Sequence, residues 1–271
     1  MHLKAEKDKS GRLIPKSLAD SEVKYIYDRG EGKYLYTPIY AAYNEKILNG
    51  IIDNTSIKAD FEAFKDTGIW ERYTLNAAQF SSAKSVAESN LIQAAIMKDG
   101  KVQSFSKFEK EANQIAETVN QTWLRTEYEL CKHEAVMGEN FRRMEQDRDL
   151  YPYWVYQGVM DDVEREEHVA LEGLVFRIGD PASDDAYPPN GWNCRCSADP
   201  VDDDYLTENN LNALTSDQAA GYLESDVDPQ FRFNAAIQGT LPNTGSYFEA
   251  MGSANEGNAS LFNLPKSSEY E

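Results

Sequence analysis

A short run of prolines, glycines and other turn residues leads into two cysteines that are one residue apart. The run is Pro188-Pro189-Asn190-Gly191-Trp192-Asn193-Cys194-Arg195-Cys196. A second motif lies upstream, and it reads Asp162-x-x-Arg165-x-x-His168-x-x-Leu171-x-Gly173. A loop-rich unit of fewer than about 60 residues seldom buries enough apolar surface to be stable alone. We therefore expect an additional stabilising link, such as a bound metal ion, in this part of the chain.

Before about residue 145, apolar residues recur at helical spacing. The spacing predicts helices over 34–52, 60–70, 75–97 and 106–144, with Pro38 in a first turn and a turn at Asp99-Gly100. Ser106 and Glu109 form a capping-box pattern at the start of the last helix. Residues 1–30 are polar and contain Gly11 and Pro15, so we predict an N-terminal arm followed by a helical region, 31–147, without a sheet.

After residue 147 the pattern changes to short strand-like and turn-like segments. Aromatic and β-branched residues predict strands over 151–156 and 173–178, with a short helix over 164–171 between them. The interpretation is an α+β chain: a mainly helical N-terminal half, then a small loop-rich α+β unit with short strands over 148–205. Residues 206–271 are predicted to be an extended acidic tail, with one helical patch over 214–223.

The charge is unevenly distributed along the chain. The net charge is −19, and residues 146–271 hold 6 Lys and Arg against 24 Asp and Glu. Phosphate backbones attract Lys and Arg, so no specific nucleic-acid binding is expected of this half. A docking face for a basic partner is the alternative to a merely soluble acidic surface. We also expect no membrane span and no secretory signal, and three cysteines favour a reducing compartment.

His168, Cys194 and Cys196 are candidate ligands of a structural zinc ion. Cysteines at i and i+2 of an extended segment point to one side, and zinc prefers thiolate and imidazole ligands. A fourth ligand would come from Cys131, His133, an Asp, a Glu or water. The alternative is that the cysteines pack as small apolar residues while His168 hydrogen-bonds to a buried carboxylate.

Charged residues in the same motifs predict a structural polar network. If Glu127 is buried, it needs a partner such as Arg165, Arg195 or His168, because an unpaired buried charge is costly. The proposed members are Arg125, Glu127, Asp162, Arg165, His168 and Arg195. The catalytic alternative is a toxin-like or hydrolase module that uses Glu127 and His168. No phosphate-binding loop, nucleophile elbow or His-Glu-x-x-His motif accompanies them, so we assign no catalytic residues.

Four blocks in this order resemble the phage Mu F-type head-morphogenesis family of minor capsid proteins. The blocks are Arg125-Thr126-Glu127, the His168 motif, the Cys-Arg-Cys motif, and Val227-Asp228-Pro229-Gln230-Phe231-Arg232-Phe233-Asn234. The resemblance covers roughly residues 105–235. The chain departs from many relatives in carrying Glu164, Glu166 and Glu167 near His168, where they have a second basic residue.

The resemblance implies a non-enzymatic virion component of a tailed bacteriophage. Its expected partners are the portal protein and the major capsid protein, without a membrane. Its expected place is inside the phage head near the portal, and in the host cytoplasm during assembly. Its expected role is in procapsid assembly and in DNA packaging or ejection.

Overall fold

The computed structural model describes residues 11–30, 35–56 and 68–251, and it has the α+β character predicted from the sequence. Two compact units are formed: unit 1 from the described parts of 1–49, 74–128 and 243–271, and unit 2 from those of 50–73 and 129–242. The helices longer than ten residues are α1 (Lys16–Arg29), α2 (Thr37–Asn54), α4 (Ile69–Ala94), α5 (Phe105–Glu117), α6 (Leu124–Gln146) and α10 (Ser216–Asp226).

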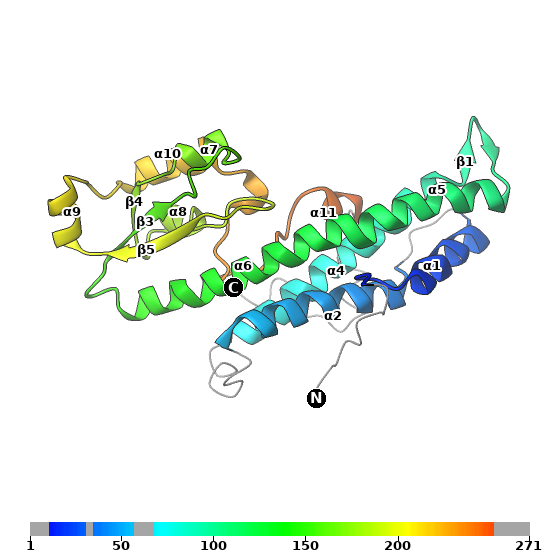
Figure 1. Cartoon of the computed structure of the whole chain (residues 1–271), viewed down its shortest axis with the longest axis horizontal. Helices are drawn as coiled ribbons and strands as arrows, with labels where there is room; N and C mark the ends of the chain where they lie inside the picture. The colour runs from blue at the N-terminus through cyan, green and yellow to red at the C-terminus, as the bar shows by residue number, and fades with distance from the viewer. Residues whose placement is uncertain (1–10, 31–34, 57–67, 252–271) are drawn as a thin grey trace. The chain divides into compact units, whose positions relative to one another are not determined.

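Unit 1 buries the apolar faces of its helices against one another. Helix α1 packs against α5 (Figure 1), and the Tyr27 ring lies 5.0 Å from the ring of Phe108. Val23 and Ile26 of α1 are fully buried. The prediction of an arm is therefore wrong for residues 16–29. Pro15 is the N-cap residue of α1, where its missing N–H removes no hydrogen bond within the helix.

Two further expectations for the helical region are wrong. A hairpin of β1 (Met97–Lys98) and β2 (Lys101–Val102) lies between α4 and α5, with the predicted turn at Asp99-Gly100. Both turn residues have positive φ, as a tight hairpin turn requires. Helix α5 begins after Ser104, whose side chain makes no capping hydrogen bond, so the capping box expected at Ser106 is absent.

The long helical pattern over 106–144 is interrupted by a π-helical segment, η2 (Thr118–Trp123). The Leu124 N–H donates to Val119 O across five residues. Such a bulge rotates the residues that follow relative to a regular α-helix. Asn120, which lies in this segment, is fully buried in unit 1.

Unit 2 is built on a three-stranded antiparallel sheet with the order β4-β3-β5. Its strands are β3 (Tyr153–Gln157), β4 (Val175–Arg177) and β5 (Ser197–Val201). One face packs under Tyr205, Leu206, Leu211 and Ala213. On the other face Trp154 stacks on Phe176 at 4.3 Å. Both faces are covered, which explains why β3 is a nearly continuous apolar run.

Short helices and turns complete both units. They are α7 (Glu166–Val169), α8 (Pro181–Asp185), α9 (Asp203–Asn209), η3 (Pro229–Phe231) and α11 (Ser246–Met251). Helix α10 packs against α8 and α7, and Thr215 with Gln218 forms its capping box. Helix α10 confirms the helical patch predicted over 214–223, whereas the extended tail predicted around it is wrong where α9, η3 and α11 form. Residues 252–271 and most of the helix predicted over 60–70 lie outside the described residues.

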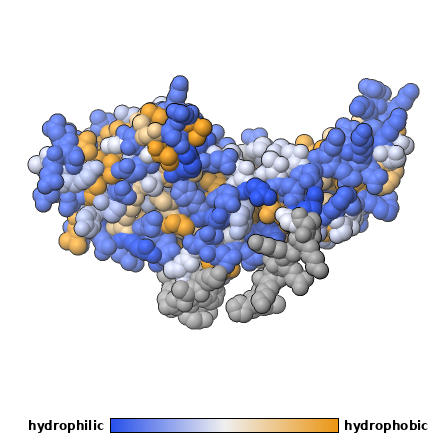
Figure 2. Space-filling view, viewed as in Figure 1, coloured by the Kyte–Doolittle hydropathy of each residue, from blue (hydrophilic) through white to orange (hydrophobic). Residues whose placement is uncertain are grey.

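The surface agrees with a chain in which 27% of the residues are charged. Hydrophilic residues cover most of the face seen in Figure 2. Several aliphatic side chains in α7 and in the segment before it are nevertheless exposed: Val159, Met160, Val163 and Val169. No described helix has the length and apolar character that a membrane span requires.

Candidate metal centre

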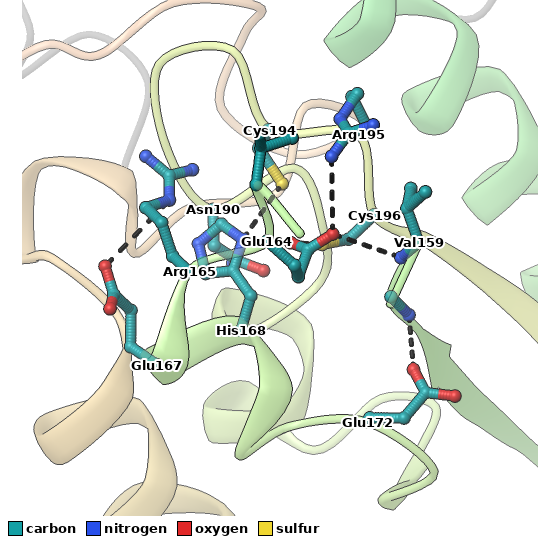
Figure 3. A network of polar contacts seen from close by, with 12 residues as sticks. Val159, Glu164, Arg165, Glu167, His168, Glu172, Asn190, Cys194, Arg195 and Cys196 are labelled. Atoms are coloured by element: carbon teal, nitrogen blue, oxygen red, sulfur yellow. Dashed lines mark hydrogen bonds and ion pairs between the residues drawn. The ribbon is translucent and has the colours of Figure 1, made fainter. Parts of the chain in front are cut away.

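His168, Cys194 and Cys196 meet in unit 2 (Figure 3). His168 comes from α7, and the cysteines come from the loop that leads into β5. All three are buried, and their ligand atoms lie within 4.8 Å of one another. His168 Nδ1 is 3.6 Å from Cys194 Sγ and 3.4 Å from Cys196 Sγ. These three residues have the types and spacing that suit a zinc ion.

The loop before β5 directs both thiols inward. Asn193 has φ +59°, a left-handed conformation that asparagine tolerates better than most residues. Gly191 leaves room for Arg165, since a Cβ atom there would lie 2.7 Å from Arg165 Nη2. Arg165 Nη1 in turn donates to Trp192 O at 3.2 Å. The arginine thus fixes the loop that presents the cysteines.

Arg195 points away from the cysteines that flank it. Its guanidinium makes two hydrogen bonds to the Asp161 carboxylate, at 2.6 and 2.7 Å. The side chains of both residues are more than two-fifths exposed. This ion pair therefore closes the outer side of the site.

Glu164 lies against the buried cluster, one helical turn before His168. Its Oε1 atom is 3.3 Å from His168 Nδ1 and 3.4 Å from Cys196 Sγ. Its Oε2 atom accepts from the Val159 N–H at 3.2 Å and lies 3.8 Å from Arg195 Nη2. The side chain is only 5% exposed. The carboxylate therefore contacts the cluster through one oxygen and its surroundings through the other.

The electrostatics of the site favour an ionised thiol. The hydrogen bond from Cys196 and the contact with His168 lower the pKa of Cys194 to about 4. The Cys194 thiolate and burial raise the pKa of Cys196 above its ordinary value. Burial alone would lower the pKa of His168, but the Cys194 thiolate raises it. A thiolate is the form of cysteine that binds metal ions.

The remaining residues of the predicted network lie elsewhere or make other contacts. Arg125 and Asp162 are exposed. Glu127 is buried. The groups that contact its carboxylate belong to unit 1, and they are not Arg165, Arg195 or His168. Lys84 Nζ lies 2.9 Å from Glu127 Oε1, and Tyr247 Oη donates to the same oxygen at 2.6 Å.

Lys84 belongs to a buried polar cluster in unit 1 that was not predicted from the sequence. Its ammonium group, fully buried, also donates to Val119 O at 3.1 Å. Asn120 Nδ2 donates to Glu88 Oε1 at 2.6 Å, and Tyr43 donates to the other oxygen of Glu88. We call these residues the Lys84 cluster: Tyr43, Lys84, Glu88, Asn120, Glu127 and Tyr247. No sequence signal pointed to this cluster, because a lysine among small polar residues is the usual pattern of a solvated helix face.

The two other candidate metal ligands, His133 and Cys131, lie outside the cluster of His168, Cys194 and Cys196. His133 Nδ1 contacts the backbone oxygen of Cys194 at 3.0 Å. Cys131 is buried within α6. The ligand atoms that all lie within 4.8 Å of one another are those of His168, Cys194 and Cys196, and this group includes neither His133 nor Cys131 nor Glu164.

Comparison with known proteins confirms the resemblance seen in the sequence. Residues 86–199 match the family described as "Phage Mu protein F like protein". This range includes Glu164, His168, Cys194 and Cys196. No solved structure was found to match the chain.

Two curated proteins match part of the chain. One is "Putative capsid assembly protein F" of Escherichia phage Mu, 44% identical over 73 residues, which are 27% of this chain and 17% of that protein. The other is "Mu-like prophage FluMu F protein" of Haemophilus influenzae, 33% identical over 94 residues, which are 35% of this chain and 23% of that protein. The matches therefore span less than a quarter of each relative.

Proposed function

We propose, from the Mu F-like region over residues 86–199, that this protein takes part in assembling the head of a tailed bacteriophage. The observation that carries the proposal is the 44% identity to a protein named for capsid assembly. The proposed partners are the portal protein and the major capsid protein.

The proposed place of action is the interior of the head, near the portal, during procapsid assembly and DNA packaging or ejection. The acidic C-terminal half supports this proposal, because a surface of that charge does not adhere to the phosphates of a packaged genome.

The experiment is to assemble heads with and without this chain in the phage or prophage that encodes it. We expect purified portal to co-sediment with the protein, and heads that lack it to be malformed or unable to deliver DNA. A complementing copy of the wild-type chain is the control. Normal assembly, packaging and ejection without the chain, together with no portal binding, would contradict the proposal.

The catalytic alternative is less well supported by the geometry. Glu127 is 2% exposed and is held by Lys84 and Tyr247, so it is poorly placed to reach a substrate. Separate Glu127→Ala and His168→Ala variants distinguish the two functions. Loss of an enzymatic activity with folding retained would favour an enzyme, whereas loss of folding supports structural roles.

A further inference from the structure

We propose that Glu164 is the fourth ligand of a closed structural zinc site, together with His168, Cys194 and Cys196. The inference concerns the folding of unit 2 and goes beyond the proposed role in head assembly. It stands on interatomic distances, burial and the surroundings of the carboxylate.

Four of the six interatomic distances of the proposed site agree with the edges of a zinc tetrahedron. Bond lengths of about 2.3 Å for sulfur and about 2.0 Å for nitrogen and oxygen give S···N and S···O edges of about 3.5 Å and N···O edges of about 3.3 Å. The observed S···N distances are 3.6 and 3.4 Å. The S···O distance to Cys196 is 3.4 Å and the N···O distance is 3.3 Å. Glu164 therefore contacts the cluster through His168 and Cys196.

A single hydrogen on the His168 ring nitrogen cannot serve all of the contacts that this nitrogen makes. His168 Nδ1 faces three groups at once: Glu164 Oε1 and the two Sγ atoms. One ring nitrogen carries at most one hydrogen, and a good N–H···O bond is about 2.7–3.2 Å long. The 3.3 Å separation from the carboxylate is longer than that. A cation among the four atoms gives each of them a partner.

The surroundings of Glu164 are those of a ligating carboxylate. Ligands of structural metals are usually oriented by hydrogen bonds from a second layer of groups. Here Oε2 accepts from the Val159 N–H, and Arg195 lies beyond it (Figure 3). Oε1 is left to face the cluster. The carboxylate is thereby oriented to bind through a single oxygen.

The burial of its four side chains indicates that the proposed zinc site would stabilise the fold and not bind a substrate. The four side chains have exposures of at most about 6%, and four protein ligands leave no position for a substrate. The ion would tie residues 164–168 to the loop that begins β5. It would supply the stabilising link that a small, loop-rich unit needs.

The test is a Co²⁺ titration of the metal-stripped full chain, followed by absorption spectroscopy. We expect visible bands of four-coordinate cobalt and a thiolate-to-cobalt charge-transfer band in the wild-type protein. In Glu164→Gln we expect the affinity to fall by at least about 10-fold, because even groups behind the ligands contribute that much. Glu172→Gln is the matched control, since this carboxylate accepts from the Gly158 N–H outside the cluster.

A second variant keeps the test decisive if Glu164→Gln does not fold. Glu164→Cys would replace an oxygen ligand by a thiolate, so its charge-transfer absorption should rise in the ratio of three thiolates to two. Cys131→Ala is the cysteine control and should match the wild type. Absence of Co²⁺ and Zn²⁺ binding would overturn the site. Full affinity in Glu164→Gln, or unchanged charge transfer in Glu164→Cys, would overturn the role of Glu164.

Discussion

In unit 1 the buried carboxylate of Glu127 has a buried ammonium group beside it, whereas no described lysine or arginine of unit 2 is buried beside His168 and the two cysteines. The Lys84 cluster holds its donors and acceptors mostly at ordinary hydrogen-bond lengths. The cluster around His168 holds its atoms 3.3–3.6 Å apart. The comparison shows that unit 1 supplies its own countercharge, whereas in our proposal the cluster of unit 2 receives a cation.

The largest expected effect is that of metal removal on unit 2. A structural zinc ion contributes roughly 10 kcal/mol or more to the folding of small zinc domains. We expect chelation to remove amide hydrogen-exchange protection from β3 and β4, while α1 and α5 stay protected. Equal protection in both units before and after chelation would break the comparison.

The next effect is the loss of the buried ammonium group in unit 1. Lys84→Met leaves Glu127 buried without its cation, which we expect to cost about 3–5 kcal/mol of unfolding free energy in denaturant titrations. Adding Glu127→Gln should recover much of that loss, because the remaining amide is neutral. If the double variant is no more stable than Lys84→Met, the pairing does not stabilise unit 1 as described.

A smaller effect concerns pH and Glu88. Burial raises the pKa of Glu88 from 4.5 to about 7, against the opposing effects of Tyr43, Lys84 and Asn120, while Glu127 adds to the rise. The folded state therefore binds the proton more tightly than the unfolded state, and stability is lost as pH rises from about 4.5 through 7. Between pH 5 and 8 the stability of Glu88→Gln relative to wild type should increase by roughly 2–3 kcal/mol. A constant difference would show that Glu88 is ionised in the folded protein throughout.

The smallest effect is expected for an exposed ion pair of the same chemical kind. Lys24 and Asp28 form an i,i+4 pair on α1, at 2.7 Å, with both side chains more than half exposed. Lys24→Ala should change the unfolding free energy by less than about 0.5 kcal/mol, because water screens the pair. A loss as large as that of Lys84→Met would mean that burial does not explain the difference.

The sequence predicted the α+β class, most helices and two of the three strands of unit 2, because those segments have clear periodicity. Strand β5 was missed because Asp199 and Pro200 are poor strand residues. At an edge strand a proline need not donate to a neighbour, which explains why it is tolerated.

The candidate site was predicted only in part. His168, Cys194 and Cys196 were found through residue types that rarely occur together by chance. The Lys84–Glu127 pair joins residues 43 positions apart, and periodicity carries no information about such contacts. Glu164 was seen as a departure from relatives, and only the fold shows its position against the cluster.

The zinc content of the purified chain is the measurement that tests the central claim most directly. The protein would be purified without added metal or chelator and analysed for its elements, with Cys196→Ser and Cys131→Ala in parallel. The account predicts about one zinc per chain for wild type and Cys131→Ala, and far less for Cys196→Ser. Folded wild-type protein with well under one zinc per chain would contradict it.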